Sequence, residues 1–558
     1  MKQIKKKVVL FIAVEAVLAI CMMVSSHPLR IFMLMTFVLG IGLFCIPSLY
    51  FELGTSPDKD FQWTAKTWVV LGLTSVGVIT ICSKSSPLYP FNDWVDANVY
   101  LTMGRAMLDG KMPYRDLYEH KGFIVYAIYA LAALISRTDF LGVWIIEIAA
   151  AFFFLYYSLR SMWLFCGERA YLWIPVLAVT VYGSAAFCHG GSAEELCLPL
   201  LAYGFWVGLK AVMLKRFPTG WECFAIGLTS GCIFWIKYNL LGFYLGWFAA
   251  LVLMLPKEKC FIQIWKMLWK IIAGVGIVTI PWMVWFWYHN ALADLVTVYF
   301  YNNLTYAAAH ESGNQLFGIL QNVCRGCQEI WRNHTAAAVL IFVGMIYLLR
   351  SRYHTWTGYI MGILVFFEIG CYMGGLTYKY YALPFSVFAV IGLAALDCLI
   401  CRRGNFFKNF QLFFIIELVI CLLAAFLVSS NTYMLRYQKS DLPQYQFRDI
   451  IAKTPEATLL EYKTMDIGVY TVCDMVPTFR YFCYYNMQKA EIDEEQDTYL
   501  MSGEADYVVI MLRDIVSEGN VELMSKIEAA GYECVSCVDY FNGENPHMYL
   551  LYRLLQKG

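Results

Sequence analysis

Residues 92–126 read NDWVDANVYLTMGRAMLDGKMPYRDLYEHKGFIVY, and they decide how the rest of this chain is interpreted. The segment is rich in charged side chains, whereas long apolar runs precede and follow it. Because charges beside lipid are costly, a cluster of them next to membrane spans indicates a functional site. The ionisable residues of the segment are Asp93, Asp96, Arg105, Asp109, Lys111, Arg115, Asp116, Glu119, His120 and Lys121.

The composition of the 558-residue chain is typical of a membrane protein. Hydrophobic residues make up 60% of it and charged residues only 15%, whereas a soluble domain carries about a quarter charged residues. The formal net charge is zero, which gives no basis for a nucleic-acid partner. We therefore expect most of the chain to lie in a lipid bilayer.

Apolar runs of about 17–25 residues are long enough to cross a membrane as helices. The first run follows a lysine-rich start without an obvious cleavage site, so we expect a retained helix with a cytoplasmic N-terminus. The sequence predicts about thirteen spans, at 7–26, 30–51, 67–84, 141–163, 171–188, 196–214, 221–238, 239–256, 271–288, 336–350, 355–373, 382–400 and 411–430.

The basic residues between the spans give the orientation, because Lys and Arg concentrate on the cytoplasmic side. The basic clusters all fall inside only if the apolar segment 122–135 does not cross the membrane. We therefore expect that segment to form a juxtamembrane or re-entrant helix. The polar residues then gather outside, in a candidate catalytic loop at 85–140 and in a domain at 431–558. This pattern predicts a multi-pass protein of the plasma membrane.

The first half of the polar segment has the pattern of a short helix. Asp93 and Asp96 are one turn apart, and we expect Asp93 to be the N-cap and Asp96 a first-turn acid. An apolar face follows, and Arg105 and Asp109 are spaced for an i,i+4 ion pair. Gly110 ends the pattern. We expect an amphipathic helix that lies in the membrane interface.

The same segment carries a family resemblance. An acid at the start of an interfacial helix, then G-x-x-P-Y-x-D, then an acid shortly before Lys-Gly, resembles the first outer loop of GT-C glycosyltransferases. Within this superfamily the pattern is most similar to that of the protein O-mannosyltransferases and aminoarabinose transferases. It therefore resembles glycosyltransferase family 39. The matching residues are Asp96, Gly110, Pro113, Tyr114, Asp116, Glu119, His120, Lys121 and Gly122.

The resemblance implies a polytopic α-helical GT-C-like domain over 1–430, with a polyprenyl-phosphate sugar as the donor and chemistry on the outer face. It also implies that Asp96 takes the place of the essential first-loop carboxylate and Lys121 that of a lysine near the lipid phosphate. The chain departs from the family at Lys121-Gly122-Phe123, where many members have Lys-Pro-Pro. This departure changes the expected turn and leaves the charge in place.

The chemistry of such a transfer needs a base near the acceptor hydroxyl and cationic or donor groups near the departing phosphate. The candidates for the catalytic carboxylates are Asp96, Asp116 and Glu119. The candidates for binding the phosphate are Lys121, Arg115 and His120. The alternative for Arg115, Asp116 and Glu119 is a solvated loop whose charges pair with one another.

The turn CHGGSAEELCLPL at 188–200 places three further polar residues before an apolar span. They are His189, Glu194 and Glu195, and we expect one of the two acids to face the substrate cavity. Alternatively, both acids complement the N-terminal dipole of the next helix. A metal cluster of His189, Glu194 and Asp96 is a further hypothesis, in which a divalent cation such as Mg²⁺ or Mn²⁺ serves as cofactor.

Two basic residues elsewhere have aromatic or tight-turn surroundings. Lys237 lies at a predicted outer hairpin, where it either binds the donor phosphate or extends to the lipid headgroups. Lys379, within TYKYYALP, resembles the HYY-x-x-x-P pattern late in many GT-C proteins, and the same two alternatives apply. We expect Tyr380 and Tyr381 of this motif to line the substrate cavity.

Beyond residue 431 the composition changes to that of a soluble α/β domain. The sequence predicts helices at 445–453 and 521–531 and strands at 457–462, 506–511 and 547–553. No nucleotide-binding fingerprint occurs there. We expect this domain to bind the acceptor or to cover the active site.

These observations favour a glycosyltransferase of the hexosyl or pentosyl type. It would move a sugar from a polyprenyl phosphate to an extracytoplasmic glycan, lipid or protein. The alternatives are a membrane transporter or lipid flippase, and a non-catalytic GT-C relative. Transporters place ionisable groups near the bilayer midplane and often contain internal repeats. In this sequence the charges gather in outer loops, which favours the enzyme.

Overall fold

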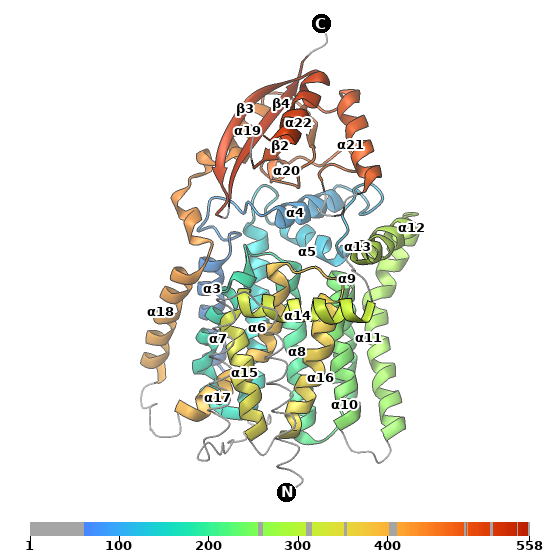
Figure 1. Ribbon diagram of the computed structural model, residues 1–558. Helices are drawn as coiled ribbons and strands as arrows, with labels where there is room; N and C mark the ends of the chain where they lie inside the picture. Colours follow the sequence, from blue (N-terminus) through green and yellow to red (C-terminus); the bar gives the residue numbers. More distant parts are fainter. Residues whose placement is uncertain are drawn as a thin grey trace.

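The computed structural model is a helical bundle with a small sheet at one end, and the helices of the polar segment lie between them (Figure 1). The structure describes residues 61–254, 260–308, 315–350, 354–400, 410–484, 487, 489–513, 517–543 and 545–555. The predicted spans at 7–26 and 30–51 lie outside the described residues.

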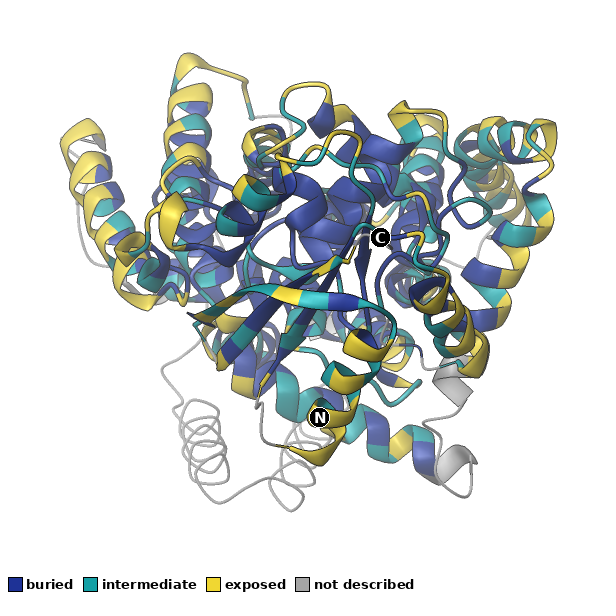
Figure 2. Ribbon diagram, turned by 90° about the horizontal axis from the view of Figure 1, so that it is seen from above, coloured by how far each residue is buried: buried dark blue, intermediate teal, exposed yellow. Residues whose placement is uncertain are grey.

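The bundle is built from long apolar helices whose outer faces remain exposed, as Figure 2 shows for the periphery of the molecule. Exposed apolar faces of this kind suit contact with lipid rather than water. The helices are α3 (Ala65–Cys82), α6 (Leu141–Cys166), α7 (Trp173–Tyr182), α8 (Ala193–Leu214), α9 (Gly220–Lys237), α10 (Gly242–Met254), α11 (Cys260–Tyr288), α15 (Thr335–Arg350), α16 (His354–Tyr372), α17 (Ala389–Ile400) and α18 (Phe410–Val428).

Length and composition identify seven helices able to cross a membrane in the described part of the chain, or eight if the bent pair α14–α15 is one span. Two of the seven are continuous stretches, Leu141–Tyr182 with 42 residues and Gly220–Met254 with 35. Each is about twice the length that one crossing needs. The structure therefore shows a multi-pass membrane protein, while the total of thirteen spans stays a prediction.

Short elements connect the bundle on the side that carries the sheet (Figure 1). The amphipathic helix α14 (Gln315–Asn333) is bent by 111° from α15. A π-helix, η5 (Val296–Asn302), joins α12 (Leu292–Leu295) to α13 (Asn303–Ala308). The 3₁₀ turns η3 (Ala185–Phe187), η4 (Tyr238–Leu241) and η6 (Lys379–Phe388) also lie on this side, whereas η2 (Gly167–Leu172) joins α6 to α7 at the opposite end of the bundle.

The polar segment folds into α4 (Val95–Leu108) and α5 (Phe123–Ala133). With 11 residues α5 is too short to cross a bilayer, in agreement with the expectation for residues 122–135. The two helices pack closely because Gly104 has no side chain. A Cβ atom at Gly104 would lie 2.6 Å from the backbone nitrogen of Ala130.

The departure from Lys-Pro-Pro at Gly122 has a steric cause. Gly122 precedes α5 and lies against α9, where a Cβ atom would come within 1.9 Å of the carbonyl oxygen of Trp235. Its backbone, with φ −68° and ψ 136°, is open to any residue. Glycine is therefore needed here for the close approach of two helices, and proline would collide with α9 as alanine would.

The C-terminal part contains a four-stranded sheet in the order β1-β2-β4-β3, in which only the β1–β2 pair is parallel. Both faces are buried: Val509 of β2 joins the main core, whereas Val508 and Ile510 join a second core. The sequence anticipated β1 (Leu459–Glu461), β2 (Tyr507–Leu512), β4 (Pro546–Leu554), α19 (Pro443–Ile451) and α22 (Glu518–Ala529). It did not anticipate β3 (Tyr532–Phe541), α21 (Ala490–Ser502) or the short α20 (Val469–Val472).

The C-terminal part covers α4 (Figure 1), so this helix is buried, and its position in the membrane interface stays a prediction. Arg105 is fully buried and donates to the carbonyl oxygen of Tyr470 at 2.9 Å. It also lies 3.5 Å from the carboxylate of Asp474. The predicted i,i+4 pair does not form, since Asp109 pairs with Arg137 at 2.8 Å.

The expectation that Asp93 caps α4 is also wrong. The cap position is Trp94, and no side chain caps the helix. Asp93 instead forms a buried ion pair with Lys84 at 2.6 Å and accepts a hydrogen bond from Tyr540 of β3 at 2.6 Å. Because a buried charge must be partnered, this contact ties the sheet to the base of the polar segment.

We predict that Gly122→Ala destabilises the protein, because the added methyl group forces α5 away from α9. Overpacking of this kind costs about 1–3 kcal/mol. The melting temperature of the purified protein in detergent measures the effect. Gly72→Ala is the matched control, since no atom lies within 4 Å of a Cβ at that position of α3. Equal melting temperatures for Gly122→Ala and the unmodified protein would contradict the steric account.

Candidate active site

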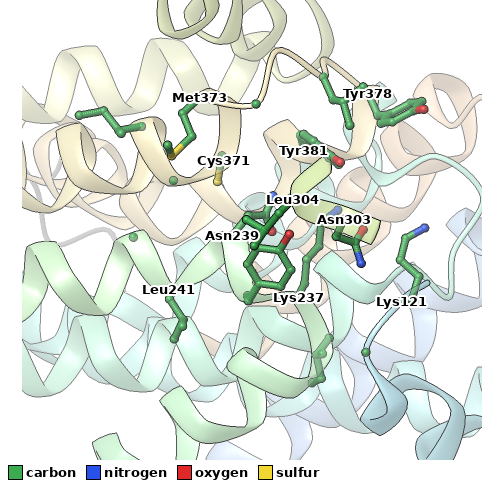
Figure 3. Close-up of a pocket in the computed structure, with 18 of the residues that line it drawn as sticks. Lys121, Lys237, Asn239, Leu241, Asn303, Leu304, Cys371, Met373, Tyr378 and Tyr381 are labelled. Atoms are coloured by element: carbon green, nitrogen blue, oxygen red, sulfur yellow. The ribbon is translucent and has the colours of Figure 1, made fainter. Parts of the chain in front are cut away.

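A cavity of about 530 Å³ lies between the end of the polar segment, the α9–α10 turn, α13, α16 and η6. One end is polar and contains Lys121, Lys237 and Asn303, whereas Leu241 and Met373 lie at the other, apolar end (Figure 3). The segment singled out in the sequence therefore supplies one wall of the cavity, and helices far along the chain supply the others.

The backbone of Lys121 is held by three buried side chains. Tyr114 and Tyr126 donate to its carbonyl oxygen at 2.7 and 3.0 Å, and Glu119 accepts from its N–H at 2.8 Å. Its ammonium lies 4.0 Å from the carboxylate of Asp96. Burial lowers the pKa of Lys121, but the charges of Asp96 and Glu119 outweigh burial and raise it above its ordinary value. The ammonium is therefore held charged.

Lys237 forms a second ion pair, with Glu194. Lys237 is the last residue of α9, and Glu194 is in the first turn of α8, so the two meet at neighbouring helix ends. Both side chains are buried, and the ammonium lies 3.8 Å from the centroid of the Tyr381 ring. Lys237 therefore lies in the protein and does not extend to the headgroups.

The two ion pairs converge on the polar end of the cavity. Lys121 and Lys237 line it, whereas Asp96 and Glu194 lie behind the lysines and are 7% and 2% exposed. Tyr380 lines the same end, with its ring 5.2 Å from the ammonium of Lys237. The structure thus brings together carboxylates and lysines from four separate elements.

Glu119 and His120 have different surroundings. Burial raises the pKa of Glu119, but His120, Lys121 and a hydrogen bond from Tyr126 together lower it below its ordinary value. Burial lowers the pKa of His120 to about 4, despite a distance of 3.2 Å between its Nδ1 and Glu119 Oε1. His120 is therefore neutral at pH 7, and Lys121 and Tyr126 keep Glu119 ionised there.

Arg115 and Asp116 pair with each other at 2.7 Å and do not line the cavity. Asp116 also accepts from the N–H of Met112 at 2.7 Å, and Arg115 donates to the carbonyl oxygen of His289 at 2.6 Å. The hydrogen bond from Arg115 is the main cause that lowers the pKa of Asp116. Both side chains hold the turn between α4 and α5.

Three other predicted residues lie away from the cavity lining. His189 contacts the side chain of Asn431 at 3.2 Å. Glu195 is fully buried, and it accepts from the N–H of Gly191 at 2.9 Å. Lys379 is exposed at the start of η6.

The hypothetical metal cluster does not form, since Asp96, Glu194 and His189 have separate partners. Within the described ranges, no three His, Cys, Asp or Glu side chains are grouped so that they could hold a metal ion.

The sequence interpretation did not select Tyr378 or Tyr299, which also line the cavity. Asn303 lines it as well and donates to the carbonyl oxygen of His120 at 2.8 Å. Asn303 directly follows the π-helix η5, a rare element that often occurs at functional sites. No periodicity in the sequence predicts a π-helix, but Asn303 itself is among the polar residues of 282–306 for which the sequence suggests a place at a substrate cavity.

Comparisons with known proteins place the fold. No protein-family model matches the chain, and neither does any curated protein. Among solved structures the chain is similar to ArnT from Cupriavidus metallidurans bound to undecaprenyl phosphate, with 12% identity and a TM-score of 0.56 over 88% of this chain and 98% of ArnT. The apo ArnT structure gives 12% identity and a TM-score of 0.55 over 87% and 98%. The chain therefore has the same fold as these ArnT structures.

Proposed function

We propose that this protein is a GT-C glycosyltransferase that moves a sugar from a polyprenyl phosphate to an acceptor hydroxyl. The observation that carries the proposal is one cavity with two lysines at its polar end and an apolar opposite end. A lipid phosphate matches this arrangement, because it has an anionic phosphate at one end and an apolar chain at the other. The neighbouring ArnT structure is bound to undecaprenyl phosphate, so this fold accommodates such a lipid.

The apolar end of the cavity opens sideways onto the bundle surface. Leu245, Phe366 and Met373 line the cavity and are 62%, 46% and 43% exposed. Exposed apolar side chains on the rim of a membrane bundle face the acyl chains. A polyprenyl chain can therefore approach from the bilayer along the outer faces of α10 and α16, which pack closely against each other, while its phosphate reaches the lysines.

The polar end suits the leaving group. During transfer the bond between the anomeric carbon and the phosphate oxygen breaks, and the phosphate gains negative charge. Lys121 and Lys237 can stabilise that charge electrostatically, which is among the strongest catalytic effects in a desolvated site. His120 is neutral, so we propose that it contributes as a hydrogen-bonding group.

Asp96 is the proposed general base. Its carboxylate lies beside Lys121, and it can accept the proton of the acceptor hydroxyl as that oxygen bonds to the anomeric carbon. We propose that Glu119 positions Lys121, because its carboxylate accepts from the backbone N–H of Lys121 and from Tyr126. We propose that Arg115 and Asp116 hold the turn, because they pair with each other and Asp116 accepts from the N–H of Met112. We propose an acceptor of glycan, lipid or protein type outside the plasma membrane.

We predict that Asp96→Asn abolishes sugar transfer while the protein still folds and binds polyprenyl phosphate. Loss of a general base lowers the rate by about 10²- to 10⁴-fold. Transfer is measured with the purified protein and a panel of labelled polyprenyl-phosphate sugars, and folding by the melting temperature. Full activity of the variant would refute the role of Asp96 as the base, and absence of transfer by the unmodified protein with every donor would refute the enzyme assignment. Sugar-independent movement of labelled lipid across vesicles would favour the flippase instead.

We predict that Lys121→Ala raises the concentration of donor lipid needed for half-maximal transfer. Loss of a charge-assisted hydrogen bond of about 1.5–3 kcal/mol corresponds to a roughly 10- to 100-fold weaker interaction. Lys453→Ala, at an exposed position beyond α19, is the matched control and leaves the donor requirement unchanged. If both variants need the same donor concentration, Lys121 does not bind the phosphate.

We predict that the protein loses stability as the pH falls from about 6.5 towards 4, in part because of His120. Burial lowers the folded-state pKa of His120 to about 4, below its ordinary value of 6.5. The contribution of His120 to the free energy of unfolding is therefore complete above pH 6.5 and is lost as the pH falls through 4. Melting temperatures between pH 7.5 and 4.5 should fall less steeply for His120→Gln. If the melting temperatures of His120→Gln and the unmodified protein fall in parallel with pH, the pKa of His120 is not lowered in the folded protein.

A further inference from the structure

The cavity contains few charged groups, and each has a partner. Among the described residues that line it, Lys121 and Lys237 are the charged side chains, since His120 is neutral at pH 7. Asp96 and Glu194 pair with the two lysines, and ionised Glu119 lies beside Lys121, so these five groups carry one net negative charge. A sugar phosphodiester brings one negative charge, which two lysines can share.

This charge pattern bears on the sugar that the donor carries. An anionic sugar adds a second negative charge, and the described lining offers no further cation for it. A cationic sugar finds no carboxylate in the described lining, since Asp96 and Glu194 are 7% and 2% exposed and lie outside it. Both kinds of charged sugar are therefore disfavoured, because unpaired charges are costly in a desolvated site.

The wall beside the lysines is aromatic and uncharged. The rings of Tyr378 and Tyr380 both line the cavity and lie parallel, with centroids 5.4 Å apart and planes 4° apart. Tyr381 packs against Tyr378 at 5.5 Å, and Trp94 packs against Tyr380 at 5.8 Å. Lys379, between the paired tyrosines in sequence, is exposed and does not line the cavity.

Such a wall suits the ring of a neutral sugar. An aromatic face can pack against the apolar C–H face of a pyranose, while tyrosine hydroxyls serve as polar groups at its edge. Asn239 and Asn303 line the same cavity and add amide donors and acceptors without charge. The lysines and the aromatic wall thus divide the polar end into a place for a phosphate and a place for a sugar.

We infer that the donor carries an uncharged pyranose, which packs on the Tyr378–Tyr380 pair while Lys121 and Lys237 bind a single phosphate. The inference rests on the proposed function and adds the chemical class of the sugar. It names Tyr378 and Tyr380 as residues that determine specificity. They recognise the sugar and not the lipid phosphate, so their substitution has a distinguishable effect.

The test measures binding of four lipids to the full-length protein in nanodiscs. The probes are bare polyprenyl phosphate and polyprenyl phosphates carrying a neutral hexose, an amino sugar or a uronic acid. We expect the neutral hexose lipid to bind most tightly. Tyr378→Leu should weaken the binding of that lipid about 3- to 10-fold, as expected for the loss of an aromatic contact of about 0.5–1.5 kcal/mol. The affinity for bare polyprenyl phosphate should stay unchanged.

Tyr288→Leu, at a position that is 76% exposed at the end of α11, is the matched control and should change neither affinity. Melting temperatures of both variants report folding. Equal or tighter binding of a charged sugar lipid, or an equal loss for bare and hexose lipids in Tyr378→Leu, would overturn the inference alone. If bare polyprenyl phosphate does not bind at all, the proposed function fails, and the inference fails with it.

Discussion

Charge compensation around Lys121 and Lys237 is the constraint on which the site depends. A lysine buried beside lipid is stable only with an anionic partner, and removal of one partner of a buried pair costs about 3–5 kcal/mol. Asp96 and Glu194 meet this requirement from α4 and α8, while the lysines come from the polar segment and α9. The ends of four elements therefore have to meet at one place, and the cavity forms beside them.

The C-terminal part has a structural connection to this arrangement. Its Tyr540 donates to Asp93, three residues before Asp96, and its Tyr470 carbonyl accepts from Arg105 near the other end of α4. The helix that carries Asp96 is thus held at both ends by residues more than 350 positions away. We infer that β3 and α20 of the C-terminal part keep the proposed base in place.

The sequence predicted those features that local patterns determine. Apolar run lengths located the described helices of the bundle, the basic residues indicated that 122–135 does not cross, and short runs of strand-forming residues located β1, β2 and β4. It also selected Asp96 and Lys121, which the structure places 4.0 Å apart. The sequence did not predict which charged residues pair when they lie far apart along the chain. The pairing of Lys237 with Glu194, 43 residues away on another helix, has no local signal.

The wrong expectations have the same origin. Spacing alone suggested an N-cap for Asp93 and an i,i+4 pair for Arg105, and both are reasonable for an isolated helix. In the folded chain Lys84 and Tyr540 provide stronger partners for Asp93, because the site is buried and excludes water. Burial by the C-terminal part, which no local pattern encodes, changed the roles of both residues.

A structure of the protein with bound polyprenyl phosphate tests the central claim most directly. The account predicts phosphate density within hydrogen-bonding distance of the ammonium groups of Lys121 and Lys237, with the chain leaving past Leu245 and Phe366. A phosphate bound elsewhere, for example at Lys379 or Arg115 and away from both cavity lysines, would contradict it.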